Sequence, residues 1–559
     1  MNNNNYSRFI PLITAISLIV GLLIGSFYAN HFTGNRLSII NTSSNKINDL
    51  LHIIDDQYVD KVNLSDLVEK AMPQILSELD PHSSYTSAKD VEEEMQDLKG
   101  SFPGIGVVFT IYSDTARIIR VVRGGPSDEV GLQAGDRIVT VDGKNFVGKM
   151  LTDDYAISHL KGPKGSKVRL GIRRPGVKKL LSYTVVRDNV PIKSISTAYM
   201  VDKTTGYIKI DSWGDTTYPE LLVALAKLHQ RGFKNLIIDL RGNRGGFMAP
   251  PIRIANEFLP KDRLIVYTQG RKSPRSEYTS DGRGSYQTIP LIVLVDETSA
   301  SSSEIFTAAI QDNDRGTIVG RRTFGKGLVQ EPIQFPDGSM LRLTIARYYS
   351  PSGRCLQKPY VQGKESDYQM DLLKRAEKGE YVSADSIHLS GKRYKTRLGR
   401  TVYGGGGVMP DYFVPEDTSG VTSYYIEAAS QGLLAQYAYI YVDYYRNRLN
   451  KMDSWTDMVK YLKKQNLPDK FANFAATKGL KRRNLLLRKS YHIMQRTLIN
   501  LILNDFYDTD VSQMYLNEND PNIAKALEIF RAGKAFPQAP AKRAHKVVKR
   551  PVKAIKARR

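Results

Sequence analysis

The sequence predicts a multidomain α+β protein that begins with a transmembrane helix. Its 559 residues are too many for one compact core and correspond to about three or four domains. Apolar residues recur at helical spacing near both ends of the chain, while the middle carries short β-runs and apolar strands that alternate with helices. The predicted parts are a cytoplasmic stub with a membrane anchor (1–30), a helical segment (31–95), a small β-barrel-like domain (96–190), an α/β core (191–415), a helical C-terminal region (416–535) and a basic disordered tail (536–559).

The N-terminal stretch has the length and composition of a membrane span. Phe9 to Ala29 carries no charge, and 21 residues at about 1.5 Å each give roughly 30 Å of helix, enough to cross a bilayer. A cleavable signal peptide is the alternative interpretation, but Phe27 and Tyr28 before Ala29 make a poor cleavage site. We therefore expect an uncleaved anchor, with everything after Asn30 exported.

Cysteine content and charge exclude some classes of protein. The single Cys355 rules out an internal disulfide framework, so the exported part must be stabilised by packing. The formal net charge is +23, and the last stretch, Ala541 to Arg559, adds nine Lys and Arg residues without an acid. Such a tail is expected to be disordered and either simply solvated or attracted to anionic lipid. Nucleic acid is not an expected partner outside the cytoplasm.

The spacing of apolar residues, and the glycines between short runs, indicate the helices and strands within each part. Helices are expected around Ile47 to Ile54 and Leu64 to Leu79, and Met494, Leu498, Ile502 and Phe506 form one i, i+4 stripe near the other end. In the small β-domain, strands are predicted over 104–111, 117–122, 137–141, 167–173 and 180–186, with a helix over 153–160. In the α/β core, apolar runs such as 236–240 and 291–295 fit strands that are buried on both faces.

One segment of the β-domain carries a peptide-binding signature. Gly131 to Ile138 (GLQAGDRI), followed by Val141-Asp142-Gly143, resembles the central motif of PDZ domains over about 90 residues. Such a fold leaves a sheet edge open, so that an extended peptide adds as a strand while backbone N–H groups hold its terminal carboxylate. The carboxylate loop of the family would fall on Phe102 to Val107, which makes Gly104, Ile105, Gly106 and Val107 the candidate tail-binding residues. The alternative is a PDZ fold kept only as a spacer or dimer contact.

A serine-rich turn follows the apolar strand Leu291 to Val295. Ser301 and Glu304 stand before an apolar helical run, which by itself reads as a helix-capping box. The position also suits chemistry, because a hydroxyl at a helix N-terminus lies beside free N–H groups and the positive end of the helix dipole.

A nucleophilic serine requires a base. None of the eight histidines lies in the α/β core near the serine cluster, and the nearest base in a special setting is Lys326, between two glycines and 25 residues after Ser301. Taken alone, this lysine reads as part of a basic loop.

The full set of motifs resembles the carboxy-terminal processing (tail-specific) protease family. The matching residues lie between about 45 and 415 and occur in the order that the family shows. They are DPHSSY (80–85), DLRGN with two glycines (239–246), SASSSEI with QD (299–305, 311–312), TFGKG with Gln330 (323–330) and GGGGVMPD (404–411).

The resemblance implies a role for each residue. Ser301 would be the nucleophile, Lys326 the general base and Gln330 the residue that holds the lysine amine, while Glu304, Asp312 and Thr323 would be supporting. The oxyanion donors would be the N–H of Ser302 and one N–H from the Gly245-Gly246 turn. A neutral lysine near pH 7 costs about 4–5 kcal/mol relative to its ordinary pKa, which requires burial.

Three positions depart from the family pattern. Ser302 stands where Ala is common, Arg244 where Pro or a small residue is usual, and Lys161 where the family often has Arg. Lys161 would couple the PDZ domain to the active site, although a lysine lacks the bidentate fork of arginine.

Two other protease classes fit the sequence poorly. A His-Asp-Ser protease with a GNSGG turn would need a serine where Arg244 stands, and a penicillin-binding type of enzyme would need a lysine where Glu304 stands. A catalytically silent PDZ-bearing scaffold is the remaining alternative, and it would predict loss of Ser301 or Lys326.

The sequence therefore predicts a serine endopeptidase with a Ser–Lys pair that acts on free, apolar C-terminal tails. We expect it in the bacterial inner membrane as a single-pass protein with its catalytic part in the periplasm. No metal or nucleotide motif is present, so no cofactor is expected. Expected partners are protein or peptide substrates, the membrane, a second copy of the chain in a homo-oligomer, with a dimer favoured, and a regulatory adaptor.

Overall fold

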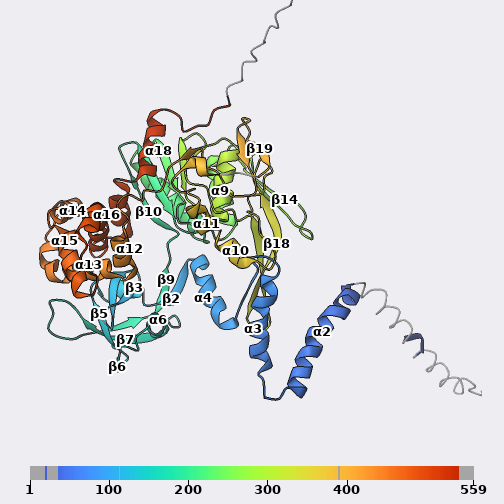
Figure 1. The fold of residues 1–559 in the computed structure, drawn as a ribbon, viewed down its shortest axis with the longest axis horizontal. Coiled ribbons are helices and arrows are strands. Elements are labelled where there is room, and N and C mark those ends of the chain that lie inside the picture. The colour runs from blue at the N-terminus through green and yellow to red at the C-terminus, as the bar shows by residue number, and fades with distance from the viewer. Residues whose placement is uncertain (1–18, 22–35, 113, 388–390, 541–559) are drawn as a thin grey trace, which may run out of the picture. The chain divides into compact units, whose positions relative to one another are not determined.

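The computed structural model describes residues 19–21, 36–112, 114–387 and 391–540, which form two compact units divided after Glu78 (Figure 1). The first unit contains α2 (Arg36–Gln57) and α3 (Leu64–Ser77), which agrees with the two helices expected there. Residues 79–95, which we had grouped with this helical segment, fall in the second unit. Apart from residues 19–21, the predicted anchor lies outside the described residues. Within the described ranges, no helix is both long and apolar enough to cross a membrane.

The small β-domain is a six-stranded sheet with two short helices. Its strands β3 (Val107–Tyr112), β4 (Thr115–Val121), β5 (Arg137–Val141), β7 (Lys167–Arg173) and β8 (Leu181–Val186) lie in that order, and β6 (Lys144–Asn145) pairs with β5. Helices α5 (Pro126–Glu129) and α6 (Asp153–Leu160) complete the domain. A separate pair, β2 (Ser101–Gly104) and β9 (Asp188–Pro191), joins its two ends. Because β3 ends the strand order, it leaves an open edge.

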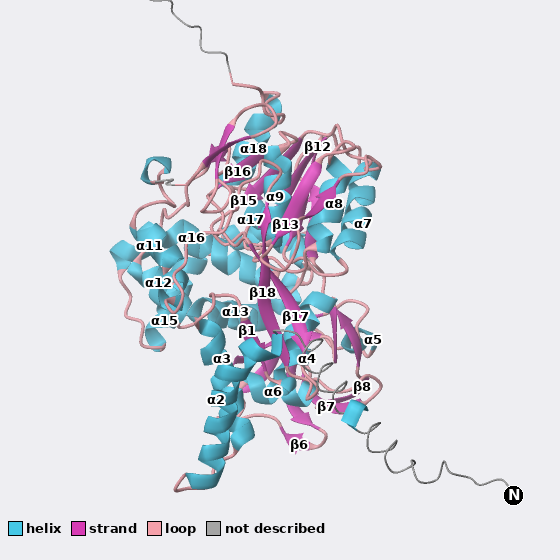
Figure 2. Cartoon of the chain, turned by 90° about the vertical axis from the view of Figure 1, so that its right-hand side faces the viewer, coloured by secondary structure: helices cyan, strands magenta, loops and turns pink. Residues whose placement is uncertain are grey.

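The larger sheet of the α/β core has the order β10-β11-β12-β15-β16-β21. Only β10 is antiparallel to its neighbour. The strands are β10 (Ile195–Met200), β11 (Thr205–Ile210), β12 (Asn235–Asp239), β15 (Leu291–Val295), β16 (Thr317–Gly320) and β21 (Tyr412–Phe413). Helices α7 (Thr217–Gln230), α8 (Ala249–Phe258) and α9 (Ser302–Asp312) pack on one face, as Figure 2 shows. Both faces of β15 are fully buried, which explains its uninterrupted apolar sequence.

A second sheet lies beside this core. Its order is β1-β18-β13-β14, and β17 pairs with β18. The strands are β1 (Ser84–Thr86), β13 (Leu264–Gln269), β14 (Ser276–Thr279), β17 (Leu328–Gln334) and β18 (Met340–Tyr349). Near it lie α4 (Ala88–Lys99), α10 (Glu365–Gln369), α11 (Asp371–Glu377) and the pair β19 (Arg393–Lys395) and β20 (Thr401–Tyr403).

The C-terminal region is helical, as predicted. A bundle with its own apolar core contains α12 (Ser423–Ser430), α13 (Leu433–Leu449), α14 (Trp455–Lys463), α15 (Leu467–Thr477) and α16 (Asn484–Leu503). The chain then returns through α17 (Thr509–Asn517) to α18 (Pro521–Arg531). Ile523 and Ile529 of α18 pack against Ile237 and Leu294 on the sheet face opposite α9. The C-terminal end therefore covers the second face of the α/β core.

Candidate active site

Ser301 lies where β15 passes into α9. The carboxyl ends of adjacent parallel strands form the usual site position in such sheets, and the turn after β12 lies beside it. Ser301 has φ 55° and ψ −115°, a backbone conformation that costs a non-glycine residue about 1–3 kcal/mol. Strain of this kind persists only where the surrounding structure enforces it, and it is concentrated at functional sites.

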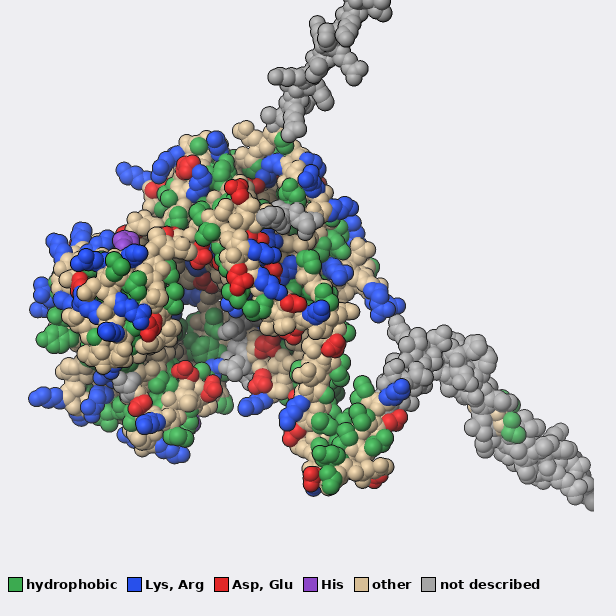
Figure 3. All heavy atoms as spheres, viewed as in Figure 1, with side chains coloured by type: hydrophobic (Ala, Val, Ile, Leu, Met, Phe, Trp, Pro, Cys, Tyr) green, Lys and Arg blue, Asp and Glu red, His purple; other side chains and the backbone are tan. Residues whose placement is uncertain are grey.

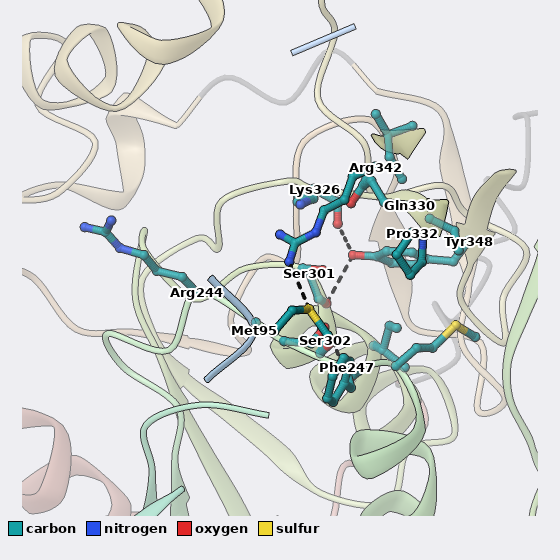
Figure 4. A pocket seen from close by; sticks show the side chains of 16 residues that line it. Met95, Arg244, Phe247, Ser301, Ser302, Lys326, Gln330, Pro332, Arg342 and Tyr348 are labelled. Carbon is teal, nitrogen blue, oxygen red and sulfur yellow. Dashed lines mark hydrogen bonds between the residues drawn. The ribbon is translucent and has the colours of Figure 1, made fainter. Parts of the chain in front are cut away.

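Lys326 reaches the same pocket from the segment that leads into β17. The pocket has a volume of about 370 Å³. Figure 4 shows Ser301 and Lys326 in its wall, together with Arg342 and Tyr348 of β18. Its apolar lining comes from Met95, Phe247, Met248, Ile305, Leu328, Val329 and Pro332. The structure thus brings together the two residues that the sequence predicts as nucleophile and base.

The carboxylate of Glu304 connects the two segments. One oxygen, Oε2, accepts the backbone N–H of Ser301 at 2.9 Å and that of Lys326 at 2.8 Å. The other, Oε1, accepts the hydroxyl of Thr323 at 2.5 Å and the N–H of Gly325 at 2.8 Å. Glu304 is fully buried, and burial raises its pKa to about 6 although these bonds act in the opposite direction. The Glu304 carboxylate therefore positions both Ser301 and Lys326.

Tyr348 adds a second connection. Its hydroxyl lies 3.1 Å from the carbonyl oxygen of Ser301 and also contacts the carbonyl oxygen of Lys326. Because Tyr348 is only 2% exposed and stands on the long strand β18, it ties the second sheet to the serine turn. The sequence analysis did not identify this residue, since a tyrosine in a β-strand carries no local signal of such a contact.

The turn after β12 packs directly on Ser301. A Cβ at Gly245 would lie 2.8 Å from the Ser301 Cβ, and one at Gly246 would lie 2.2 Å from the carbonyl oxygen of Trp213, so both positions require glycine. The hydroxyl of Ser302 lies 2.9 Å from the carbonyl oxygens of Gly246 and Phe247, which fastens this turn to the start of α9. Arg244 is exposed and points away from Ser301 (Figure 4), so it leaves the turn intact.

The N–H groups of this turn are not equivalent. The Gly245 N–H donates to Asn243 Oδ1 at 2.9 Å and is therefore already occupied. Within the described part of the chain, the N–H groups of Gly246 and Ser302 have no acceptor. Of the predicted oxyanion donors, Gly246 and Ser302 are thus available for a developing negative charge, and Gly245 shapes the turn.

The electrostatic setting of Lys326 favours its neutral form. Burial lowers the pKa of Lys326, and the positive charge of Arg342 lowers it further, while Asp80 and Glu304 act in the opposite direction. His82, which the sequence analysis did not place here, lies near enough for the charge of Lys326 to help burial lower its own pKa to about 3. An imidazole with so low a pKa is a poor general base at neutral pH. The chemistry of the pocket therefore favours the lysine.

Comparison with known proteins agrees with this geometry. Residues 204–370 match the model of peptidase family S41, residues 117–174 match the PDZ domain, and residues 424–508 match a family of unknown function. A carboxy-terminal-processing protease of Bartonella bacilliformis is 34% identical over 317 residues, which cover 56% of this chain and 72% of that protein. The carboxy-terminal processing protease CtpA of Bacillus subtilis is 31% identical over 396 residues, 68% of this chain and 80% of that protein.

The chain belongs to the carboxy-terminal processing proteases of peptidase family S41. It is a serine-type endopeptidase that carries a PDZ domain. Among solved structures, the photosystem II D1 C-terminal processing protease is 26% identical and covers 56% of this chain and 91% of that one, with a TM-score of 0.33.

The supporting residues Thr323 and Asp312 fix the segments that carry Lys326 and Ser301. Thr323 donates to Glu304 and accepts the N–H of Val408 at 2.7 Å. The glycine-rich motif at 404–411 is therefore hydrogen-bonded to the segment that carries Lys326. Asp312, at the far end of α9, forms a fully buried ion pair with Arg354 at 2.7 Å. This pair offsets an acid at a helix C-terminus, where it is electrostatically unfavourable. Asp312 therefore acts on the orientation of α9.

Gln330 lines the pocket but has a different partner from the one expected. Its Nε2 donates to Thr344 Oγ1 at 3.2 Å, and Thr344 donates to Asp80 Oδ1 at 3.0 Å. A register shift between Val329 and Gln330 in the pairing of β17 with β18 accompanies this orientation. The structure thus connects Gln330 to the Asp80-Pro81-His82 motif, and the proposed contact with the Lys326 amine stays a prediction.

The candidate tail-binding residues surround the start of the open edge strand β3. The carbonyls of Ile105 and Gly106 accept N–H groups from Ser127 and Val122, which fixes the loop, and Gly106 has φ 76°. Across the described ranges, the N–H groups of Ile105 and Gly106 have no acceptor. Gly104 and Val107 flank these two groups, and Lys161 lies with its amine 5.5 Å from the Phe102 ring. The loop therefore offers free donors beside an open strand.

Proposed function

We propose that this protease cleaves proteins from their free C-terminal tails by a Ser–Lys acyl-enzyme mechanism. The observation that carries the proposal is the pocket in which a strained Ser301 and a lysine of lowered pKa are held by the same carboxylate. Neutral Lys326 takes the proton of the Ser301 hydroxyl as its Oγ attacks the peptide carbonyl, and the N–H groups of Gly246 and Ser302 stabilise the oxyanion.

The second half of the reaction returns the proton. Protonated Lys326 gives it to the leaving amine as the C–N bond breaks, which leaves an ester between Ser301 and the acyl part of the substrate. Water then attacks this ester as the lysine takes one of its protons, the bond between the acyl carbon and Ser301 Oγ breaks, and the lysine returns the proton to Oγ as the carboxylic acid product leaves. The apolar lining of the pocket supports this sequence, because it favours the uncharged lysine before each attack.

Tail recognition is assigned to the PDZ domain. The substrate adds as a strand to the edge of β3, and its carboxylate accepts the free N–H groups of Ile105 and Gly106. Met95, Phe247 and Leu328 in the pocket favour apolar residues near the scissile bond. We further propose that the segment from Phe9 to Ala29 anchors the protein in the bacterial inner membrane with the catalytic part in the periplasm. Accessibility of the PDZ domain and the α/β core to protease added to spheroplasts tests that orientation.

The decisive experiment compares one disordered peptide with a free apolar C-terminus and its amidated copy. We expect wild type to cleave the free peptide at least tenfold faster, and Ser301→Ala and Lys326→Ala to abolish cleavage of both. Lys234→Ala, an exposed lysine of the same core, is the matched control and should behave as wild type. Equal cleavage of free and amidated peptides would refute tail recognition alone, whereas full activity of Lys326→Ala would refute the Ser–Lys mechanism.

A further inference from the structure

The helical bundle that matches a family of unknown function contacts the PDZ domain through charged side chains. Asp505, just after α16, lies 2.8 Å from Arg117 of β4. Asp443 of α13 lies 2.7 Å from Arg137 of β5 and 3.5 Å from Arg117. These pairs join segments more than 300 residues apart. Figure 1 shows the bundle beside β3 and β5.

The contact continues along β4 and just past its end, beyond these three pairs. Arg120 Nη1 donates to Thr509 Oγ1 at 2.5 Å, and Arg123 lies 3.3 Å from Asp508. The ring of Tyr439 on α13 lies 4.4 Å from the Arg117 guanidinium, in cation–π geometry. Four arginines of the PDZ domain, Arg117, Arg120, Arg123 and Arg137, therefore face one side of the helical region.

The bundle is basic overall, and some of its few acidic residues lie at this contact. Residues 424–508 contain 14 Lys and Arg residues against seven Asp and Glu residues. Three of the seven acids are the ones paired with PDZ arginines, and lysines and arginines dominate the outward face of the bundle in Figure 3. A basic domain that presents three of its seven acids to arginines of the PDZ domain is complementary to them in charge at this contact.

The centre of this contact is fully desolvated. The Arg117 side chain is 0% and that of Asp505 1% exposed, and Arg446 of α13 adds a second cation 2.9 Å from Asp505. Removing one partner of such a buried pair is strongly destabilising, because the other charge is left without compensation. Replacing a buried ion pair with well-packed hydrophobic residues is often neutral or stabilising, so this pair is weak evidence for net stability and better evidence for a defined orientation of the two partners.

We propose that residues 424–508 are an internal docking domain for the arginine-lined edge of the PDZ domain. Docked there, β4 is fixed, and so is the edge strand β3 that pairs with it. The return of the chain through α17 and α18 ties the same domain to the α/β core: Asn517 donates to Tyr199 at 2.9 Å, and Asp520 pairs with Arg241 at 2.8 Å. The bundle thus holds the open strand at a set place relative to Ser301. Docking is independent of the proposed mechanism, while its effect on cleavage depends on tail recognition.

The test uses charge exchange in the full chain at the Arg137–Asp443 pair, which is less buried than the central Arg117–Asp505 pair. Arg137→Asp and Asp443→Arg each place like charges together, and the double variant restores opposite charges between positions 137 and 443 but not between 443 and Arg117. We expect amide hydrogen exchange in β4 and β5 to rise at least tenfold in each single variant and to return to within about threefold of wild type in the double variant. Asp457→Arg, which removes an acid that pairs with exposed Lys460, is the control and should exchange as wild type.

The outcomes separate docking from other causes. Single variants that exchange as wild type, or a double variant no closer to wild type than the singles, would overturn the proposal. If a single variant does not fold, Arg137→Gln and Asp443→Asn give the same comparison with a smaller perturbation. If docking places β3 for tail delivery, cleavage of the free-tailed peptide should fall at least fivefold in the single variants and recover in the double variant. Cleavage that stays constant while exchange rises would leave docking supported and refute its effect on tail delivery.

Discussion

Replacing Glu304 with glutamine tests whether one carboxylate organises the active site. The substitution keeps the shape of the side chain but turns one of its two acceptor oxygens into an NH2 group. In the wild type, each oxygen accepts two hydrogen bonds. If the glutamine amide oxygen still accepts the N–H groups of Ser301 and Lys326, the N–H of Gly325 loses its acceptor. In the other orientation, the N–H groups of both Ser301 and Lys326 lose theirs.

The effect on stability is small because two contributions oppose each other. Each buried N–H left without an acceptor costs about 1–3 kcal/mol. Against this, the pKa of Glu304 rises from 4.5 to about 6 on burial, which corresponds to a penalty of about 2 kcal/mol for the ionised form, and glutamine removes that penalty. Over both orientations, the substitution therefore changes the free energy of unfolding by an amount between about 1 kcal/mol of stabilisation and about 4 kcal/mol of destabilisation. The positional effect is larger, since a displacement near 1 Å costs about 100-fold in rate.

Steady-state kinetics and thermal unfolding together decide this prediction. For Glu304→Gln we expect kcat to fall about 100-fold with KM nearly unchanged, and Tm to fall by only a few degrees. Glu257→Gln is the matched control, because Glu257 is also a buried carboxylate that accepts a tyrosine hydroxyl, at 2.6 Å, but does not line the pocket. It should lower Tm and leave kcat within about twofold. A Glu304→Gln enzyme with kcat within about threefold of wild type would refute the organising role.

The pH dependence of stability checks the same reasoning. Since the pKa of Glu304 is higher in the folded than in the unfolded chain, the folded state binds the proton more tightly. Its contribution is then fully present below the unfolded pKa and is lost as pH rises through about 6. Relative to Glu304→Gln, wild type should lose up to about 2 kcal/mol across this window in denaturant titrations. Parallel curves for the two proteins would contradict the raised pKa.

Two further changes probe the base and the oxyanion turn. Because Lys326 must be neutral, kcat/KM should rise with pH to an inflection below about 10.4, the ordinary lysine value. Arg342→Gln removes a positive charge that lowers this pKa, so the inflection should move to higher pH, and a downward shift would refute the assigned effect. In Gly246→Ala, the new Cβ would lie 2.2 Å from the Trp213 carbonyl oxygen and push the turn away from Ser301. We expect kcat to fall about 100-fold with little change in circular dichroism, and kcat within twofold of wild type would exclude the Gly246 N–H as an oxyanion donor.

The sequence predicted those features of the site that depend on local order along the chain. The apolar run 291–295 is strand β15, the serine cluster begins α9, and Lys326 enters the same pocket as Ser301. The strand and the start of the helix follow from local apolar and capping patterns, whereas the pairing of Lys326 with Ser301 was implied by the resemblance to the protease family. The same holds for the PDZ signature, whose segment matches the family model over residues 117–174.

Features that depend on distant segments could not be predicted in this way. His82 approaches Lys326 from 244 positions earlier in the chain, and Gln330 bonds to Thr344 beside a register shift that no spacing reveals. The sequence alone does not show what the apolar stripe of Met494, Leu498, Ile502 and Phe506 packs against; in the structure it packs within the bundle itself. The acids of the C-terminal helices find the PDZ arginines only through the tertiary fold, and oligomerisation stays a prediction.

The geometry around Glu304 also explains how a carboxylate and a neutral lysine coexist. A negative charge so close to Lys326 raises the pKa of the amine, which opposes its role as a base. That opposition is limited because the charge of Glu304 is directed into four hydrogen bonds with backbone and Thr323 groups rather than into an ion pair with the Lys326 amine. Arg342, itself paired with Glu94, adds positive charge on the other side of the lysine. The site therefore uses an acid to place the base through its backbone while burial and a neighbouring cation keep the amine neutral.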